Sequence, residues 1–120
     1  MEDKEFEQME KAESKMDTAF DKLTESISNG KMIFEPLRYS SVSAINAASK
    51  CEMKGILGAY NEIGEFHAGF DTTLRQIKKK QSLSKSQEEK VEDLMDKYED
   101  ALGDFIIAHL NLNCSCKRLT

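Results

Sequence analysis

The feature that most constrains the fold is a stretch of helical periodicity that runs from Leu37 to Lys80 without an internal proline. Apolar and small residues recur there at alternating steps of three and four, which is the spacing of one face of an α-helix. The chain's only proline, Pro36, stands just before this stretch, where its fixed φ suits the first turn of a helix. We therefore expect one long helix over residues 36–80 that packs in the manner of a coiled coil.

A helix is also expected on each side of this stretch. Residues 3–28 carry apolar side chains at heptad a and d positions, and Glu13 is the single polar residue in that seam. Asn29-Gly30 is expected to end the first helix, because glycine accepts the left-handed backbone of a C-cap. Residues 31–35 would then connect it to the long helix.

The last helix is expected over residues 86–111. Ser86 and Glu89 have the spacing of a capping box, and apolar residues recur with helical period beyond them. The sequence therefore predicts an all-α fold, an antiparallel three-helix, coiled-coil-like bundle. It forms one domain over residues 1–113, with a flexible tail over residues 114–120.

An alternative with four helices depends on two glycines in the long stretch. Gly55 and Gly58 each weaken a helix by about 1 kcal/mol relative to alanine. A break near them would divide the long helix in two. The continuous or gently kinked helix is the preferred prediction.

Short connections predict that the long helix and the last helix lie side by side. Folding back at residues 81–86 pairs residue i with a residue numbered about 167 minus i, which places His67 level with Asp100. The same register brings Cys51 near Cys114 or Cys116, so a bridge to either one is conceivable. In a reducing compartment we expect free thiols instead, with Cys51 buried and the C-terminal pair exposed.

Charge and composition argue against several classes of function. The formal net charge of −5 argues against a general nucleic-acid binder, whose affinity depends on neutralising phosphates. No apolar run is long enough for a membrane span, and the acidic N-terminus lacks the apolar stretch of a secretory signal. We therefore expect a soluble, cytoplasmic protein.

Catalytic and metal-binding motifs are not recognised. Neither His67 nor His109 has the Glu-x-x-His spacing of bundle metal sites, so each is expected to be a packed histidine. The chain also has no nucleophile elbow and no phosphate-binding glycine loop. We expect no enzyme activity, no cofactor, no metal and no small-molecule substrate.

The long stretch instead predicts contacts with other proteins. Its second half is strongly apolar over a wider face than one neighbouring helix needs, which favours self-association, most simply as a two-fold dimer. Its first half carries small residues every four positions, which allow close helix packing. The sequence thus favours a non-enzymatic interaction module: an adaptor, an assembly subunit or a protein inhibitor. The expected interaction surface consists of Ala47, Cys51, Gly55, Ala59, Tyr60, Ile63, His67, Phe70 and Leu74.

A second hypothesis concerns the basic turn between the last two expected helices. Lys78, Lys79, Lys80 and Lys85 could contact an anionic membrane surface, each contributing about 1 kcal/mol. In helix length and antiparallel arrangement the chain resembles the curved helical modules of the BAR type. That resemblance is one of architecture, and it implies a dimer that touches membranes through basic residues.

Overall fold

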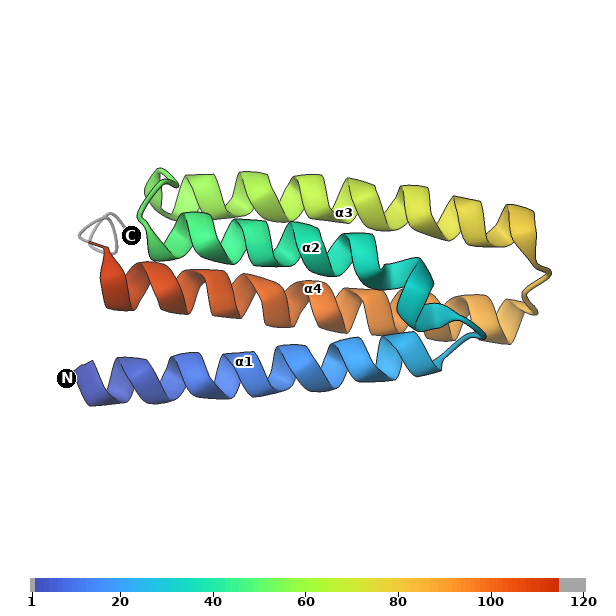
Figure 1. The fold of residues 1–120 in the computed structure, drawn as a ribbon, viewed down its shortest axis with the longest axis horizontal. Coiled ribbons are helices and arrows are strands. Elements are labelled where there is room, and N and C mark those ends of the chain that lie inside the picture. Colours follow the sequence, from blue (N-terminus) through green and yellow to red (C-terminus); the bar gives the residue numbers. More distant parts are fainter. Residues whose placement is uncertain (1, 115–120) are drawn as a thin grey trace.

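The computed structural model describes residues 2–114 of the chain. Within them it has four helices and no strand: α1 (Glu2–Glu25), α2 (Gly30–Ser49), α3 (Gly55–Lys80) and α4 (Lys85–Asn113). Successive helices run in opposite directions along one long axis (Figure 1), and the Cα positions span 48 × 23 × 20 Å. The predicted all-helical class is confirmed. No helix in this part of the chain has the length and apolar character that crossing a bilayer requires.

The single long helix predicted over residues 36–80 is wrong, because the chain turns between Ser49 and Gly55. Cys51 has a left-handed backbone, with φ of 58°. The amide of Glu52 donates to the carbonyl of Ala47 at 2.8 Å, and the amide of Cys51 donates to the carbonyl of Ala48 at 3.2 Å. This is the hydrogen-bond pattern of a Schellman motif, which ends α2 and uses the carbonyls that a helix end leaves free.

The two halves of the stretch are thus separate helices, as in the four-helix alternative. Gly55, also left-handed with φ of 61°, begins α3, so the break lies just before Gly55 and not between it and Gly58. The left-handed position at the end of α2 is normally filled by glycine, since other L-residues there cost roughly 1–2 kcal/mol. A cysteine at this position hides the turn from sequence reasoning.

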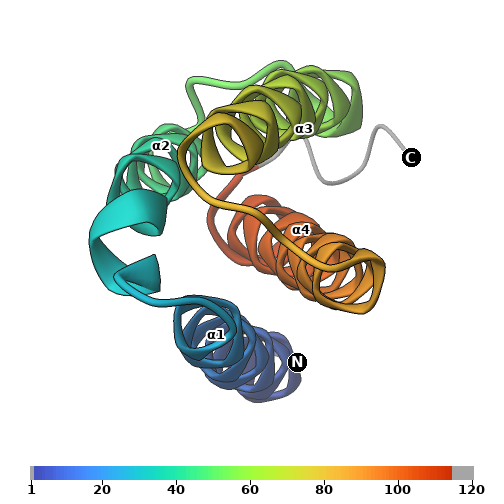
Figure 2. The same ribbon diagram turned by 90° about the vertical axis from the view of Figure 1, so that its right-hand side faces the viewer.

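The junction of α1 and α2 also differs from the prediction. Asn29 is the left-handed residue, with φ of 61°, and Gly30 is the first residue of α2. Residues 31–35 are helical and not a connector, and Pro36 lies inside α2. The ribbon of α2 bends in its first part (Figures 1 and 2). A Cβ at Gly30 would lie 2.1 Å from the carbonyl oxygen of Thr24, so the tight turn requires glycine.

The N-cap of α4 is Ser84, two residues before the one predicted. The Ser84 hydroxyl accepts a hydrogen bond from the amide of Gln87 at 3.1 Å, and the Gln87 side chain accepts one from the amide of Ser84 at 2.9 Å. This is a capping box of the expected kind at a different pair of residues, and Ser86 and Glu89 lie within the helix. The predicted bounds of α1 and α4 are otherwise within three residues of those observed.

The core is built around α4. Tyr98 lies at its centre, with ring centroids 5.4 Å from Phe20, 5.7 Å from Phe66 and 6.1 Å from Phe70. The end-on view in Figure 2 shows the four helices around this core, and α4 packs against each of the other three, most extensively against α1. Within the described residues, no Cα atom of α1 lies within 8 Å of a Cα atom of α3.

A disulfide bond joins Cys51 to Cys114, with their Cα atoms 5.6 Å apart. It ties the turn after α2 to the end of α4. The expectation of free thiols is therefore wrong, as is that of an exposed Cys114 and a buried Cys51: Cys114 is buried and Cys51 is exposed. Cys116 and the rest of the predicted tail lie outside the described residues.

Candidate functional site

A groove of about 630 Å³ lies between α1 and α2, with α4 as its floor. Small-molecule and peptide sites in proteins commonly have volumes of about 300–1,000 Å³. The groove is therefore large enough to take a ligand or a row of partner side chains. Its lining residues are Phe6, Met9, Glu10, Glu13, Met16, Asp17, Phe20, Arg38, Ser41, Val42, Ile45, Asn46, Ser49, Tyr98, Phe105 and His109.

The wall formed by α1 is its heptad seam. Phe6, Met9, Glu13, Met16 and Phe20 follow the a and d spacing that predicts burial in a coiled coil. Only the C-terminal part of this seam is covered by the chain itself, because Phe20 is buried whereas Phe6 is 49% exposed and Met9 and Met16 are half-buried. The N-terminal part of the seam is therefore only partly covered by the other described residues.

The wall formed by α2 is more polar. Arg38, Val42, Ile45, Asn46 and Ser49 recur at helical spacing and face the groove. Val42 is 47% exposed, which is high for a β-branched apolar residue in a helix that faces its own bundle. The groove thus places an apolar stripe of α1 opposite a mixed stripe of α2.

Two serines of α2 hold the floor of the groove in the same way. Ser41 donates to the carbonyl of Leu37 at 2.8 Å and accepts from the hydroxyl of Tyr98 at 2.8 Å. Ser49 donates to the carbonyl of Ile45 at 2.9 Å and pairs with Nδ1 of His109 at 3.0 Å. Each serine uses its hydrogen within its own helix and offers its lone pairs to α4.

This arrangement assigns the tautomer of His109. Because the Ser49 hydrogen is directed at Ile45, the Ser49 oxygen accepts from His109, and Nδ1 carries the ring proton. Nε2 is then an unprotonated acceptor, and it is buried without a hydrogen-bond partner among the described residues. Burial lowers the pKa of His109, and the carboxylate of Glu13 across the groove opposes this shift. His109 is therefore neutral near pH 7.

The groove carries more negative than positive charge. Glu10, Glu13 and Asp17 are exposed on the α1 wall, and none of them forms an ion pair with another described residue. Arg38 on the α2 wall lies with its guanidinium carbon 5.2 Å from the ring centre of Phe20, which holds that cation over an aromatic face. A positively charged group that enters the groove would meet an unpaired acidic wall.

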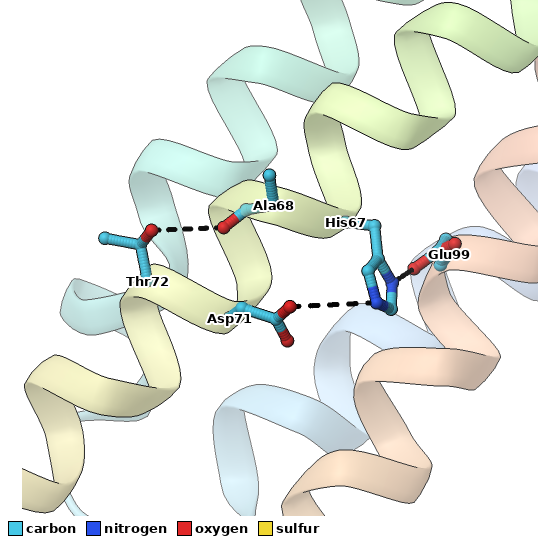
Figure 3. Close-up of polar contacts among 5 residues, drawn as sticks. All are labelled: His67, Ala68, Asp71, Thr72 and Glu99. Atoms are coloured by element: carbon cyan, nitrogen blue, oxygen red, sulfur yellow. Dashed lines mark hydrogen bonds and ion pairs between the residues drawn. The ribbon is translucent and has the colours of Figure 1, made fainter.

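A second polar cluster lies between α3 and α4. Nδ1 of His67 is 2.6 Å from a carboxylate oxygen of Glu99, and Nε2 is 3.9 Å from a carboxylate oxygen of Asp71. Figure 3 shows His67 of α3 between these two carboxylates. The hydrogen bond to Glu99, followed by the attraction of the same carboxylate, raises the pKa of His67. The pair also agrees with the predicted register of α3 and α4, in which His67 lies level with Asp100. Its observed partner, Glu99, is the neighbouring residue in the sequence.

The same cluster has donor atoms that a divalent metal can use. One ligand atom from each of His67, Asp96 and Glu99 lies within 4.8 Å of the others. Imidazole with two carboxylates is a donor set suited to zinc and similar ions. His67 and Asp96 are exposed, however, and the geometry is that of an interhelical ion pair. We assign this cluster the role of joining α3 to α4.

The residues expected to form an interaction surface are separated by the fold. Gly55, Ala59, Phe70 and Leu74 are buried in the bundle core, and Ile63 packs against its edge. They therefore present no free face on this chain, because α4 and α2, which the turn at residues 50–54 folds back, both pack against α3. Ala47 is half-buried, and Cys51 is taken up by the disulfide bond. Tyr60, at 64% exposure, and His67 remain accessible on α3.

The lysine-rich turn is exposed at one end of the bundle. Lys78 forms an ion pair with Glu88, which neutralises part of the basic patch. Lys79, Lys80 and Lys85 are exposed and make no ion pair with other described residues. The available positive charge is thus smaller than the sequence alone implies.

Sequence reasoning missed the groove, although one signal for it was present. Glu13 interrupts the apolar seam of α1, and a carboxylate at such a position is costly if a helix covers it completely. The half-open groove removes this cost.

Comparison with protein-family models, with curated proteins and with solved structures found no match to this chain.

Proposed function

We propose that this protein is a non-enzymatic, helical protein–protein interaction module, acting as an adaptor, an assembly subunit or a protein inhibitor. Its binding site is the groove between α1 and α2, and the occupant is a helix of a partner. The observation that carries the proposal is the open part of the α1 seam, where Phe6, Met9 and Met16 have coiled-coil spacing but incomplete cover.

The exposed apolar residues on both walls add support. Phe6 and Val42 leave about half of their surface to solvent on opposite sides of one groove. Exposed apolar surface gathered in a groove is typical of sites that bind an amphipathic helix. Scattered residues such as Leu57, at 77% exposure on α3, do not line this groove.

Site-specific photo-crosslinking tests this function. A benzophenone amino acid is placed at Val42 in the groove and, as a matched control, at Leu57 outside it, and both proteins are irradiated in their native cell. We expect a protein adduct at Val42 that is lost when Met9→Asp is added, and mass spectrometry should place the crosslink in a helical segment of the partner. Equal adducts at both positions, or none at Val42, would contradict the proposal.

A second candidate function uses the lysine-rich turn as a contact with anionic membranes. It is supported by the exposure of Lys79, Lys80 and Lys85 at one end of the bundle. Co-sedimentation with vesicles containing phosphatidylserine tests it. Binding that disappears when these three lysines are changed to glutamine would favour this function, and binding that persists would exclude the turn as its cause.

A further inference from the structure

We infer that the segment that docks in the groove is a basic amphipathic helix of about four turns, an inference that rests on the proposed function. Three features of the groove determine this choice of partner: its length, the spacing of its two walls and the charge of its α1 wall. Each feature is independent of the identity of the protein that carries the helix.

The length of the groove matches a helix. Its α1 wall extends from Phe6 to Phe20, which corresponds to about 21 Å at about 1.5 Å per residue. A compact small molecule would fill only part of this length. A helix of about 14 residues would follow it from end to end and would remain parallel to both walls.

The spacing of the walls favours the same occupant. The stripes of α1 and α2 both repeat at steps of three and four residues, so both present ridges and grooves inclined to the helix axis. An inserted helix with apolar residues at the same spacing can pack knobs into the holes beside Met9 and Met16. Such a helix would also bury Phe6 and Val42.

The charge of the wall selects a basic helix. Glu10, Glu13 and Asp17 lie along α1 without ion-pair partners among the described residues, whereas Arg38 is held over Phe20. Lysine or arginine residues beside the apolar stripe of the incoming helix would lie next to these carboxylates. Complementary charge of this kind sets the preference among partners and raises the rate of association.

The same charges argue against a second copy of α1 as the occupant. Residues 1–28 contain nine acidic and four basic side chains, so two copies of α1 in one groove would repel each other. The matching partner has the opposite balance.

Titration with designed peptides tests the inference. The probes are fluorescein-labelled leucine–lysine peptides of about 18 residues with leucines at helical spacing, a version with every lysine replaced by glutamate, and a scrambled leucine–lysine peptide. Fluorescence anisotropy with the full chain is measured at low and at near-physiological salt. We expect the helical leucine–lysine peptide to bind at least about tenfold more tightly than the other two.

Variants of the protein distinguish peptide binding in the groove from attraction to the net negative charge of the whole chain. Combining Glu10→Gln, Glu13→Gln and Asp17→Asn should weaken binding of the basic peptide about tenfold. Removing the same number of charges elsewhere, with Glu62→Gln, Glu65→Gln and Glu92→Gln, should change it less than about twofold. Circular dichroism and urea unfolding establish that both variants are folded.

The other outcomes overturn the inference in distinct ways. Equal weakening by both sets of substitutions would mean that the peptide senses only net charge. Tight binding of the glutamate peptide would leave the groove as a docking site but reverse the predicted charge of the partner. Self-association of the chain that blocks the groove, measured by sedimentation, would replace the basic helix with a second copy. The crosslink at Val42 decides the proposed function independently of all three.

Discussion

The hydroxyl of Tyr98 donates a hydrogen bond of 2.8 Å to the hydroxyl of Ser41. The Ser41 hydroxyl in turn donates a hydrogen bond to the carbonyl of Leu37. Both side chains are buried, and burial raises the pKa of the Tyr98 phenol. This relay joins the centre of α4 to α2. It satisfies three buried polar groups with two hydrogen bonds.

The relay predicts strong coupling between its two residues. Ser41→Ala should destabilise the fold by about 1–3 kcal/mol, because the Tyr98 hydroxyl loses its acceptor in the core. Tyr98→Phe should cost about 1 kcal/mol, since Ser41 keeps its bond to Leu37. The double variant should cost at least about 0.5 kcal/mol less than the two single costs together. Urea unfolding measures all three, and additive costs would contradict the relay.

The two histidines predict opposite dependences of stability on pH. The raised pKa of His67 means that its contribution is complete below the ordinary histidine pKa and is lost as the pH rises through the folded value. The lowered pKa of His109 means that its contribution is complete above the ordinary value and is lost as the pH falls. The carboxylates that face them are Glu99, Asp96 and Asp71 for His67, and Glu13 for His109.

Substituting each histidine separates these effects. Compared with the parent chain, His67→Gln should lose relatively more stability near pH 5.5 than near pH 7.5, because the protonated pair with Glu99 is gone. His109→Gln should show the reverse trend. Urea midpoints at several pH values between about 5.5 and 7.5 provide the measurement. Parallel pH profiles for the two variants would contradict the assignment.

The disulfide bond predicts a stability that depends on redox conditions. It closes a loop between residues 63 positions apart, for which chain-entropy arguments give about 4 kcal/mol. Reduction, or the pair Cys51→Ser and Cys114→Ser, should therefore lower Tm by many degrees. Cys116→Ser is the matched control and should leave Tm and its sensitivity to reductant unchanged. Non-reducing peptide mapping that recovers Cys51 as a free thiol would contradict the bond.

Two glycines predict opposite effects of the same substitution. A Cβ at Gly64 would meet nothing within 4 Å, so Gly64→Ala should stabilise α3 by about 0.5–1 kcal/mol through helix propensity. A Cβ at Gly30 would meet the carbonyl of Thr24, so Gly30→Ala should be strongly destabilising. Thermal unfolding of both variants tests this, and a shift of the same sign for both would contradict the tight turn at Gly30.

The helices were predictable where their periodicity and end signals agreed. The apolar period located α1 and α4 to within three residues, and the hairpin register placed His67 within one residue of its partner. The break after α2 was not predictable from the same signals. Its left-handed residue is Cys51, and nothing in the local sequence distinguishes this cysteine from its neighbours in a small-residue stripe.

The groove depended on information that periodicity does not contain. A heptad seam predicts which face of α1 is apolar, but it does not predict how much of that face the same chain covers. In the structure α1 packs mainly against α4, and Phe6 and Val42 lie on opposite walls of the groove. Most of the α3 residues expected to form an interaction surface instead pack inside the bundle, and Phe70 and Leu74 are in the core.

The bond between Cys51 and Cys114 also divides the molecule by chain topology. Everything between these residues, including all of α3 and α4, belongs to one covalent ring, whereas α1 and α2 precede it. The floor of the groove, with Tyr98 and His109, thus lies inside the ring, and both walls lie outside it. Hydrogen exchange should report this division as two cooperative units, with the walls exchanging at lower free energy than the ring. A partner helix bound in the groove would then stabilise α1 and α2 against the ring of α3 and α4, which the disulfide bond already closes.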